Sequence, residues 1–255
     1  MGFRHPGSAA RRADGPLPHS VPRLRDAAAL RTQLHRRPLR RPAAALHRGV
    51  PAMKSASLTS GTLILIASAG LTAFGGNAFA LHMVVHMAIV AMAAPMIALG
   101  IRSTSLDLST RLTWITPLTA SLIELVTVIF WHLPQIRLVA DQSLIVTLFE
   151  QIAFFAAGLL LWLSCLSAPP LAGVGGLLFT SMHMTLIGVL LALAPRPLYG
   201  VGAVTCLGMP LSAAADQQVG GVAMLLVGAV SYLVGGIALL NRLVAATPDG
   251  PERAR

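Results

Sequence analysis

One stretch of 47 residues, Ser55 to Ile101, contains no Asp, Glu, Lys or Arg. A soluble helical domain would present charged side chains to water several times over that length, since an average soluble chain is about 25% charged. Only 11% of this 255-residue chain is charged, and 55% is hydrophobic. A membrane helix needs about 20 mostly apolar residues. The stretch is therefore long enough for two crossings, and we predict an integral membrane protein.

Six segments are long and apolar enough to cross a bilayer. We predict an all-α polytopic bundle of about six transmembrane helices over residues 57–76, 79–100, 112–132, 143–165, 172–194 and 218–241, with turns at the breaks between them, such as Pro134 to Asp141. Residues 198–215 are also apolar, but Gly200, Gly202, Gly208 and Pro210 interrupt them. We predict an external loop or re-entrant segment there rather than a seventh span. The membrane domain then covers residues 55–243, between a tail over residues 1–54 and a short tail over residues 244–255.

Basic residues fall mainly on one side of this topology. The side that holds both termini carries 17 of the 19 basic residues, and the other side carries Arg137 and Arg196. Without residues 1–52 the ratio is still six to two. Positive loops stay in the cytoplasm, so we expect both termini to be cytoplasmic.

The tail over residues 1–54 is rich in arginine and proline and lacks apolar periodicity. Its first 52 residues hold 11 basic residues against Asp14 and Asp26. Such a composition cannot bury a core, so we predict a disordered cytoplasmic tail. A basic arm that binds anionic lipid or nucleic acid is one alternative, and a start codon assigned too early, before Met53-Lys54, is another. We favour the plain tail or the later start and expect no nucleic-acid partner.

Small residues on the last predicted helix indicate close packing. Gly221, Gly228 and Gly235 recur every seven residues on the last helix, and such a stripe allows a neighbouring backbone to approach closely. Cys165 and Cys206 fall at opposite membrane faces, so we expect no disulfide between them.

Polar side chains gather at the predicted external ends of the helices. His82 and His86, spaced four apart, face the same way with β-carbons roughly 5–6 Å apart. Met83 and Met87 form a second pair on the adjoining stripe. Further polar groups at the same face are Trp131-His132, at the end of the third helix, and Asp216-Gln217, at the start of the sixth.

Three ionisable groups lie deeper in the predicted bundle. Glu150 is about 10 Å below the external end of its helix, Glu124 is roughly 12 Å below His132, and His183 is near the middle of the fifth helix. Ionisable side chains at such depth face a protein interior or a water-filled cavity. Together these groups predict a polar path from the outer surface towards mid-membrane.

Two imidazoles on one helix face with a thioether nearby suit copper, and thioether sulfur favours Cu(I). Simpler roles remain open for single members of this set. A lone interfacial histidine forms surface hydrogen bonds, Trp131 is a typical interfacial anchor, Asp216 suits the N-cap of the sixth helix, and methionine is ordinary apolar filler.

At four places in order, over about residues 79–240, the chain resembles the multi-spanning CtaG family of cytochrome c oxidase assembly factors. The blocks are His82 to Met87 running on to Ala94-Pro95 and Leu99-Gly100, Trp131 to Pro134, Gly188 through Tyr199, and Asp216 to Gly221. The resemblance implies a role in maturing the copper centres of haem-copper oxidases in the cell's inner (plasma) membrane. Its matched positions are His82, His86, Trp131, His132, Asp216 and Gln217.

The chain departs from that family at two places. Family members commonly carry His-x-x-Glu-His at the start of the fourth helix, whereas Thr147 to Gln151 keeps only Glu150 and has no histidine. Arg137 stands where an aromatic residue is usual. A site that uses histidines from this helix therefore cannot form here. Either three histidines with methionine suffice, His183 substitutes, or the chain is a divergent paralogue without copper function.

The leading hypothesis is a non-enzymatic assembly factor that holds copper through His82, His86 and His132, with Met83 or Met87 as a soft fourth ligand. Its partners would be the lipid bilayer, a copper donor protein and a cytochrome c oxidase subunit. A b-type haem electron carrier with bis-histidine ligation is a second hypothesis. Ion translocation through Glu124, Glu150 and His183 is a third, weakened because no inverted repeat is evident. Hydrolase and zinc-protease motifs are missing from the sequence.

Overall fold

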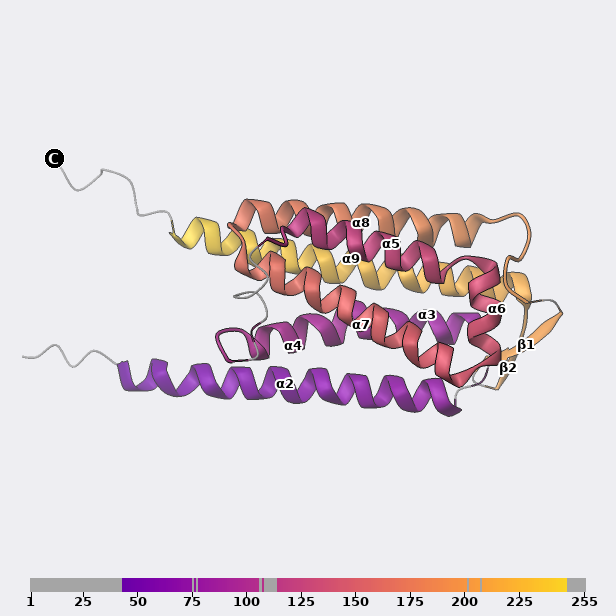
Figure 1. The fold of residues 1–255 in the computed structure, drawn as a ribbon, viewed down its shortest axis with the longest axis horizontal. Helices are drawn as coiled ribbons and strands as arrows, with labels where there is room; N and C mark the ends of the chain where they lie inside the picture. Colours follow the sequence, from indigo (N-terminus) through magenta and orange to yellow (C-terminus); the bar gives the residue numbers. More distant parts are fainter. Residues whose placement is uncertain are drawn as a thin grey trace, which may run out of the picture. The chain divides into compact units, whose positions relative to one another are not determined.

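The computed structural model describes residues 43–74, 76, 78–105, 107, 114–200, 202–206 and 208–246. The chain divides after His47 into two units, and the second, Arg48–Arg255, contains the helical bundle (Figure 1). Helix α2, Ala43–Phe74, begins within the predicted tail, so residues 43–54 are helical rather than disordered. The alanines at its start are strong helix formers, which explains the earlier boundary. The remainder of that tail, residues 1–42, lies outside the described residues, as do 247–255.

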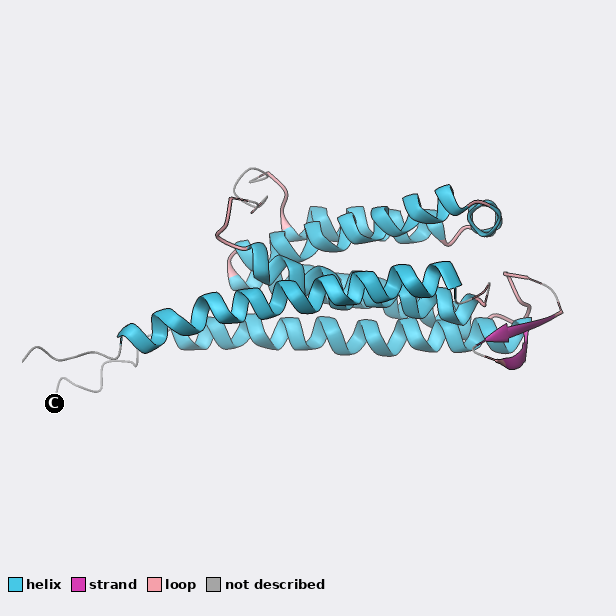
Figure 2. Ribbon diagram, turned by 90° about the horizontal axis from the view of Figure 1, so that it is seen from below, coloured by secondary structure: helices cyan, strands magenta, loops and turns pink. Residues whose placement is uncertain are grey.

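The prediction of a nearly all-helical bundle is confirmed (Figure 2). Among the described residues, five helical segments are long and apolar enough to cross a membrane, and there are six if the bent pair of α5 and α6 is counted as one crossing. After α2 come the following elements: α3 (Phe79–Met87), η1 (Ala88–Ala93), α4 (Ala94–Ile101), α5 (Pro117–Trp131), α6 (Pro134–Gln142), α7 (Leu144–Ser167), α8 (Pro170–Leu193), β1 (Ala203–Cys206), β2 (Met209–Ser212) and α9 (Ala213–Ala246).

Proline fixes where several helices begin. Pro117, Pro134 and Pro170 each lie in the first turn of a helix, where the N–H that proline lacks would have no partner. Thr116 caps α5 by accepting a hydrogen bond from the Thr119 amide. The third span was predicted from residue 112, but α5 begins at Pro117, and residues 112 and 113 lie outside the described residues.

The second predicted span is one continuous rod with a π-helical turn, η1, between α3 and α4. Pro95 follows η1 and has no N–H to donate to the carbonyl of Ala91, one turn earlier. The hydroxyl of Ser231 on α9 donates to that carbonyl instead. A neighbouring helix thus satisfies the backbone group that proline leaves free inside the membrane region.

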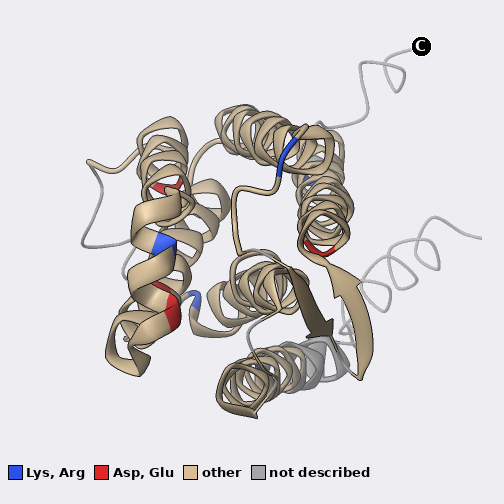
Figure 3. Ribbon diagram, turned by 90° about the vertical axis from the view of Figure 1, so that its right-hand side faces the viewer, with Lys and Arg blue, Asp and Glu red and all other residues tan. Residues whose placement is uncertain are grey.

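The helices of the second unit form a closed ring. The rod α3–η1–α4 packs on α9, α9 on α8, α8 on α5, α5 on α7, and α7 back on η1 and α4. Helix α2 packs outside the ring, where Leu58 lies against Gly100 of α4. A view along the bundle shows almost uncharged ribbon with a few blue and red segments (Figure 3), as expected for helices surrounded by lipid.

The predicted packing stripe of glycines on α9 is confirmed, but each glycine meets a different helix. A β-carbon at Gly221 would lie 2.7 Å from backbone atoms of α8, one at Gly228 would lie 3.3 Å from Met87, and one at Gly235 would lie 2.5 Å from Trp162. Cys165 and Cys206 are both free, and Cys165 is buried.

Residues 198–215 do not form a seventh span, in agreement with the prediction. They contain the antiparallel hairpin β1–β2, in which Ala203 pairs with Ser212 and Cys206 with Met209. Gly208 lies in the turn of this hairpin, and its φ of +85° favours glycine. We call the end of the bundle that carries this hairpin and α6 the hairpin end, and the opposite end, where α4 and α9 finish, the basic end (Figure 1).

The segment Pro134 to Asp141, predicted as a turn, is the helix α6. It is bent by 71° from α5 and lies across the hairpin end (Figure 1). In Figure 1, α2 ends at the hairpin end and α9 ends at the basic end.

Candidate functional site

The two histidine-bearing segments converge at the hairpin end, as predicted. His86 lies on α3 and His132 directly follows α5, and their ring centroids are 5.7 Å apart with an interplanar angle of 67°. The His86 side chain is fully buried. Both rings therefore face the interior of the bundle rather than lipid.

His86 has no hydrogen-bonding partner for either ring nitrogen among the described residues. Its ring packs on Phe154 of α7, with the two centroids 3.9 Å apart. Buried polar atoms are almost always hydrogen-bonded, so two unpartnered imidazole nitrogens on one fully buried side chain indicate a ligand site.

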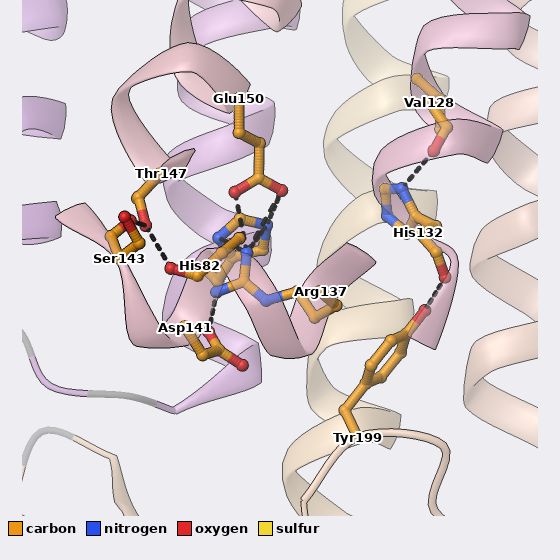
Figure 4. Close-up of polar contacts among 10 residues, drawn as sticks. His82, Val128, His132, Arg137, Asp141, Ser143, Thr147, Glu150 and Tyr199 are labelled. Carbon is orange, nitrogen blue, oxygen red and sulfur yellow. Dashed lines mark hydrogen bonds and ion pairs between the residues drawn. The ribbon is translucent and has the colours of Figure 1, made fainter. Parts of the chain in front are cut away.

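His132 is held in one tautomer by the backbone of its own helix. Nδ1 lies 2.7 Å from the carbonyl oxygen of Val128, which only accepts, so Nδ1 carries the proton (Figure 4). Nε2 is then the nitrogen with the free lone pair, and it is buried without a partner among the described residues. Metal-binding histidines are commonly oriented in this way, through the nitrogen that does not bind the metal.

Tyr199, in the loop after α8, fixes the position of His132. Its hydroxyl donates a hydrogen bond of 2.6 Å to the His132 carbonyl oxygen. Burial raises the pKa of Tyr199 to about 12, so the hydroxyl keeps the proton that it donates across the physiological range.

His82 has a different environment, because its ring is in contact with the guanidinium of Arg137. Nη1 of Arg137 lies 2.9 Å and 3.1 Å from the two ring nitrogens of His82. Nε2 of His82 also lies 3.3 Å from Oε1 of Glu150. Both nitrogens of His82 are thus in contact with charged groups of the protein, unlike those of His86.

Arg137 is the centre of a buried charge cluster (Figure 4). Nη1 contacts both carboxylate oxygens of Glu150, at 3.2 Å and 2.9 Å, and Nη2 pairs with Asp141 one turn further along α6. Glu150 is fully buried and Arg137 is 8% exposed. The cluster lies beside a cavity of about 70 Å³ that His82, Arg137 and Asp141 help to line.

Arg137 departs from the family pattern in the sequence, but no role was predicted for it. Arg137 and Asp141 are spaced i, i+4, the separation at which oppositely charged side chains meet on a helix. That spacing was a usable signal, but residues 134–141 had been interpreted as a turn, where it carries no such meaning.

Met83 and Met87 face α9 instead of the histidines. Cγ of Met83 lies 2.9 Å from the position of a β-carbon at Gly220, and Cε of Met87 lies 3.3 Å from that at Gly228. Both side chains are buried in the hydrophobic core. Their observed contacts are those of core packing.

Asp216 and Gln217 tie separate segments to the start of α9. Asp216 accepts hydrogen bonds from the amides of Phe79 (2.7 Å) and Ala80 (3.0 Å). It therefore caps α3, and the prediction that it caps its own helix is wrong, since Ser212 bonds the Ala215 amide at the start of α9.

Gln217 joins α9 to α8 and to the loop that follows it. Its amide accepts from the Leu198 backbone N–H at 2.6 Å and donates to the Leu191 carbonyl at 3.0 Å. Both matched residues thus support the fold that positions His82, His86 and Tyr199.

Three other predicted residues lie away from the pair of imidazoles. Trp131 is partly buried against the core and packs edge-on against Phe130. His183 on α8 contacts Phe179, and neither of its ring nitrogens has a partner among the described residues. Glu124 accepts a hydrogen bond of 3.1 Å from the hydroxyl of Tyr232. Among the described residues, hydrogen bonds and ion pairs do not join these groups into a continuous path with Glu150.

The donor set suits a soft ion of low coordination number better than a divalent cation. Among the described residues, no three His, Cys, Asp or Glu side chains are grouped as ligands for one metal ion. One ion between two imidazoles, at roughly 2.0 Å from each nitrogen, separates the ring centroids by about 6 Å, and the 5.7 Å between His86 and His132 is close to that. The neutral nitrogens of His86 and His132 fit Cu(I).

Comparison with known families finds one match, to the cytochrome c oxidase caa3 assembly factor family, Caa3_CtaG, over residues 33–246. Comparisons with curated proteins and with solved structures find no match. The matched region covers all of the helices from α2 to α9. The resemblance seen in the sequence blocks is therefore confirmed over most of the chain, and this membrane protein belongs to the cytochrome c oxidase caa3 assembly factor family.

Proposed function

We propose that this assembly factor binds Cu(I) between His86 and His132 and passes it to a copper centre of cytochrome c oxidase. The observation that carries the proposal is the buried pair of rings, 5.7 Å apart, with unpartnered nitrogens. Copper is the cargo in this scheme, received from a donor protein and released to an oxidase subunit. The role is non-catalytic, and the hairpin end faces away from the cytoplasm in the inner (plasma) membrane, as the distribution of basic residues favours.

The proposal differs from the three-histidine site expected from the sequence. His82 interacts with Arg137 and Glu150, and Met83 and Met87 pack on α9. In this proposal the copper ligands are therefore the imidazoles of His86 and His132. Arg137 supplies the positive charge beside the carboxylates of Glu150 and Asp141.

Copper binding by the purified protein in detergent tests this proposal. The wild-type protein should bind one Cu(I), measured by competition with a chromogenic Cu(I) chelator, and His86→Ala and His132→Ala should each abolish binding. His183→Ala is the matched control, because His183 is also a buried helical histidine with unpartnered nitrogens. Equal stoichiometry in the wild-type protein and in both site variants would refute the site.

A test in cells addresses delivery separately. A strain that lacks the protein should contain oxidase of low activity and low copper content, and added copper should restore both. A normal oxidase in the deletion strain would indicate a divergent paralogue.

The haem alternative is less compatible with the space around the histidines. Small-molecule sites are clefts of about 300–1,000 Å³, whereas the cavity at His82 measures about 70 Å³. His86 is in close contact with Phe154. A single ion requires much less room than a porphyrin.

A further inference from the structure

A second candidate site lies along α9 towards the basic end of the bundle, away from His86 and His132 at the hairpin end. It is an apolar groove of about 580 Å³ between α4, α7 and α9. Its lining includes Met96 and Leu99 of α4, Trp162 of α7, and Leu226, Ala238 and Arg242 of α9. Along α9 the groove runs 16 residues, from Leu226 to Arg242, or roughly 24 Å, which is longer than the hydrocarbon half of a bilayer, about 15 Å.

Three cations gather where the groove reaches the basic end. Arg242 lines the groove itself. The Lys54 ammonium donates a hydrogen bond of 2.9 Å to the Arg102 carbonyl oxygen. Burial and, to a smaller extent, the positive charge of Arg242 lower the pKa of Arg102, whereas the negative charge of Asp107 raises it. Arg102 and Arg242 are therefore close enough to repel each other, and an anion between them would relieve that repulsion.

Trp162 forms part of the groove lining below the cations. Its side chain is 5% exposed. Its ring lies against Gly235, where an added β-carbon would be 2.5 Å away. Gly235 is seven residues, about 10 Å, before Arg242. The lining below the cations is therefore apolar and suits an acyl chain.

We propose that this groove binds one anionic glycerophospholipid. The phosphate lies among Lys54, Arg102 and Arg242, and an acyl chain lies along α9 and Trp162. Basic pockets between membrane helices bind anionic headgroups, and the apolar lining of this groove suits an acyl chain. The inference does not depend on copper binding, because the histidines lie at the other end of the bundle.

Native mass spectrometry of the purified full chain tests this inference. Phosphatidylglycerol and phosphatidylcholine with identical acyl chains are titrated separately, so that the two lipids differ only in the headgroup. The wild-type protein should retain one phosphatidylglycerol more tightly than phosphatidylcholine. Arg242→Gln should weaken retention of phosphatidylglycerol about fivefold, the effect of one surface cation. It should weaken phosphatidylcholine less, because the choline cation of that lipid offsets its phosphate charge. Arg196→Gln, which removes an exposed cation at the hairpin end, is the control.

Two further variants test the groove itself. Ala238→Trp fills the groove and should reduce retention of both lipids, whereas Leu240→Trp, two residues further on and outside the lining, should not. Equal retention of the two lipids by the wild-type protein would overturn the proposal, and so would unchanged phosphatidylglycerol binding in Ala238→Trp, which would leave the groove to a protein partner.

Discussion

Nη1 of Arg137 lies 2.9 Å from Oε2 of Glu150, and both side chains are buried where α6 packs on α7. The guanidinium of Arg137 therefore lies beside the carboxylate of Glu150. Both ring nitrogens of His86 and Nε2 of His132, in contrast, have no partner among the described residues. We interpret Arg137 as the residue that keeps divalent cations out of this pocket.

The first prediction concerns stability. Arg137→Met should lower the free energy of unfolding by about 3–5 kcal/mol, because it leaves the buried carboxylate of Glu150 without its partner. Adding Glu150→Gln should recover part of that loss, since the uncompensated charge is then removed. Thermal unfolding in detergent measures both effects. Arg196→Met is the control at an exposed arginine and should change stability by about 0.5 kcal/mol or less; an equal loss in both arginine variants would contradict the role of the pair.

The second prediction concerns metal selectivity. In Arg137→Ala, His82, Asp141 and Glu150 are left around an enlarged cavity without a cation. The variant should bind one Co²⁺ that the wild-type protein does not bind, because carboxylate and imidazole ligands suit divalent ions. The absorption spectrum of bound Co²⁺ and equilibrium dialysis measure this. Arg137→Lys keeps the charge and should bind none, and the double variant Arg137→Ala/Glu150→Gln should lose the site; absence of Co²⁺ binding in Arg137→Ala would show that the cation has no such role.

The third prediction concerns the cap that Asp216 supplies to α3. Asp216→Ala removes the acceptor of the Phe79 and Ala80 amides, which should cost about 1–2 kcal/mol of stability. It should also weaken Cu(I) binding, because His82 and His86 lie in the first turns of that helix. Chelator competition and thermal unfolding check the two effects. Ser212→Ala, which removes the exposed cap of α9, should affect stability alone, and an equal loss of copper binding there would argue against a specific effect of Asp216.

The fourth prediction concerns the contact between α8 and α9. Gly221→Ala should destabilise the bundle by about 1–3 kcal/mol, because the new β-carbon would lie 2.7 Å from the backbone of Ala192 and Gly188. Gly175→Ala is the matched substitution on α8, where nothing lies within 4 Å of the new β-carbon. Its stability should be unchanged or slightly higher. Similar unfolding temperatures for the two variants would contradict the packing seam.

The fifth prediction concerns orientation in the membrane. Cys206, in the hairpin, is partly exposed, and Cys165 is buried. A membrane-impermeant maleimide should label Cys206 in intact cells if the hairpin end faces away from the cytoplasm, and Cys206→Ser should abolish that labelling. Labelling that occurs only after the cells are opened would reverse the predicted topology.

Much of the fold followed from the sequence because a bilayer imposes simple conditions. Each crossing must be a long apolar helix whose backbone bonds are satisfied internally, so the spans could be located from runs such as Ser55 to Ile101. The turn residues around Gly208 excluded a further span. The convergence of His86 and His132 was also predictable, since both lie at helix ends on one predicted face.

Only the tertiary structure decided which polar groups are partners. The sequence placed His82 with His86 because four residues separate them, but Arg137, 55 residues away, contacts His82. It placed Asp216 at the start of its own helix, but the carboxylate caps α3, 137 residues earlier. The physical reason is that helical periodicity fixes only the direction of a side chain relative to its own helix. Which donor or acceptor a side chain meets depends on how separate helices pack. That packing follows from contacts such as the one between Gly221 of α9 and the backbone of α8, which no local sequence pattern contains.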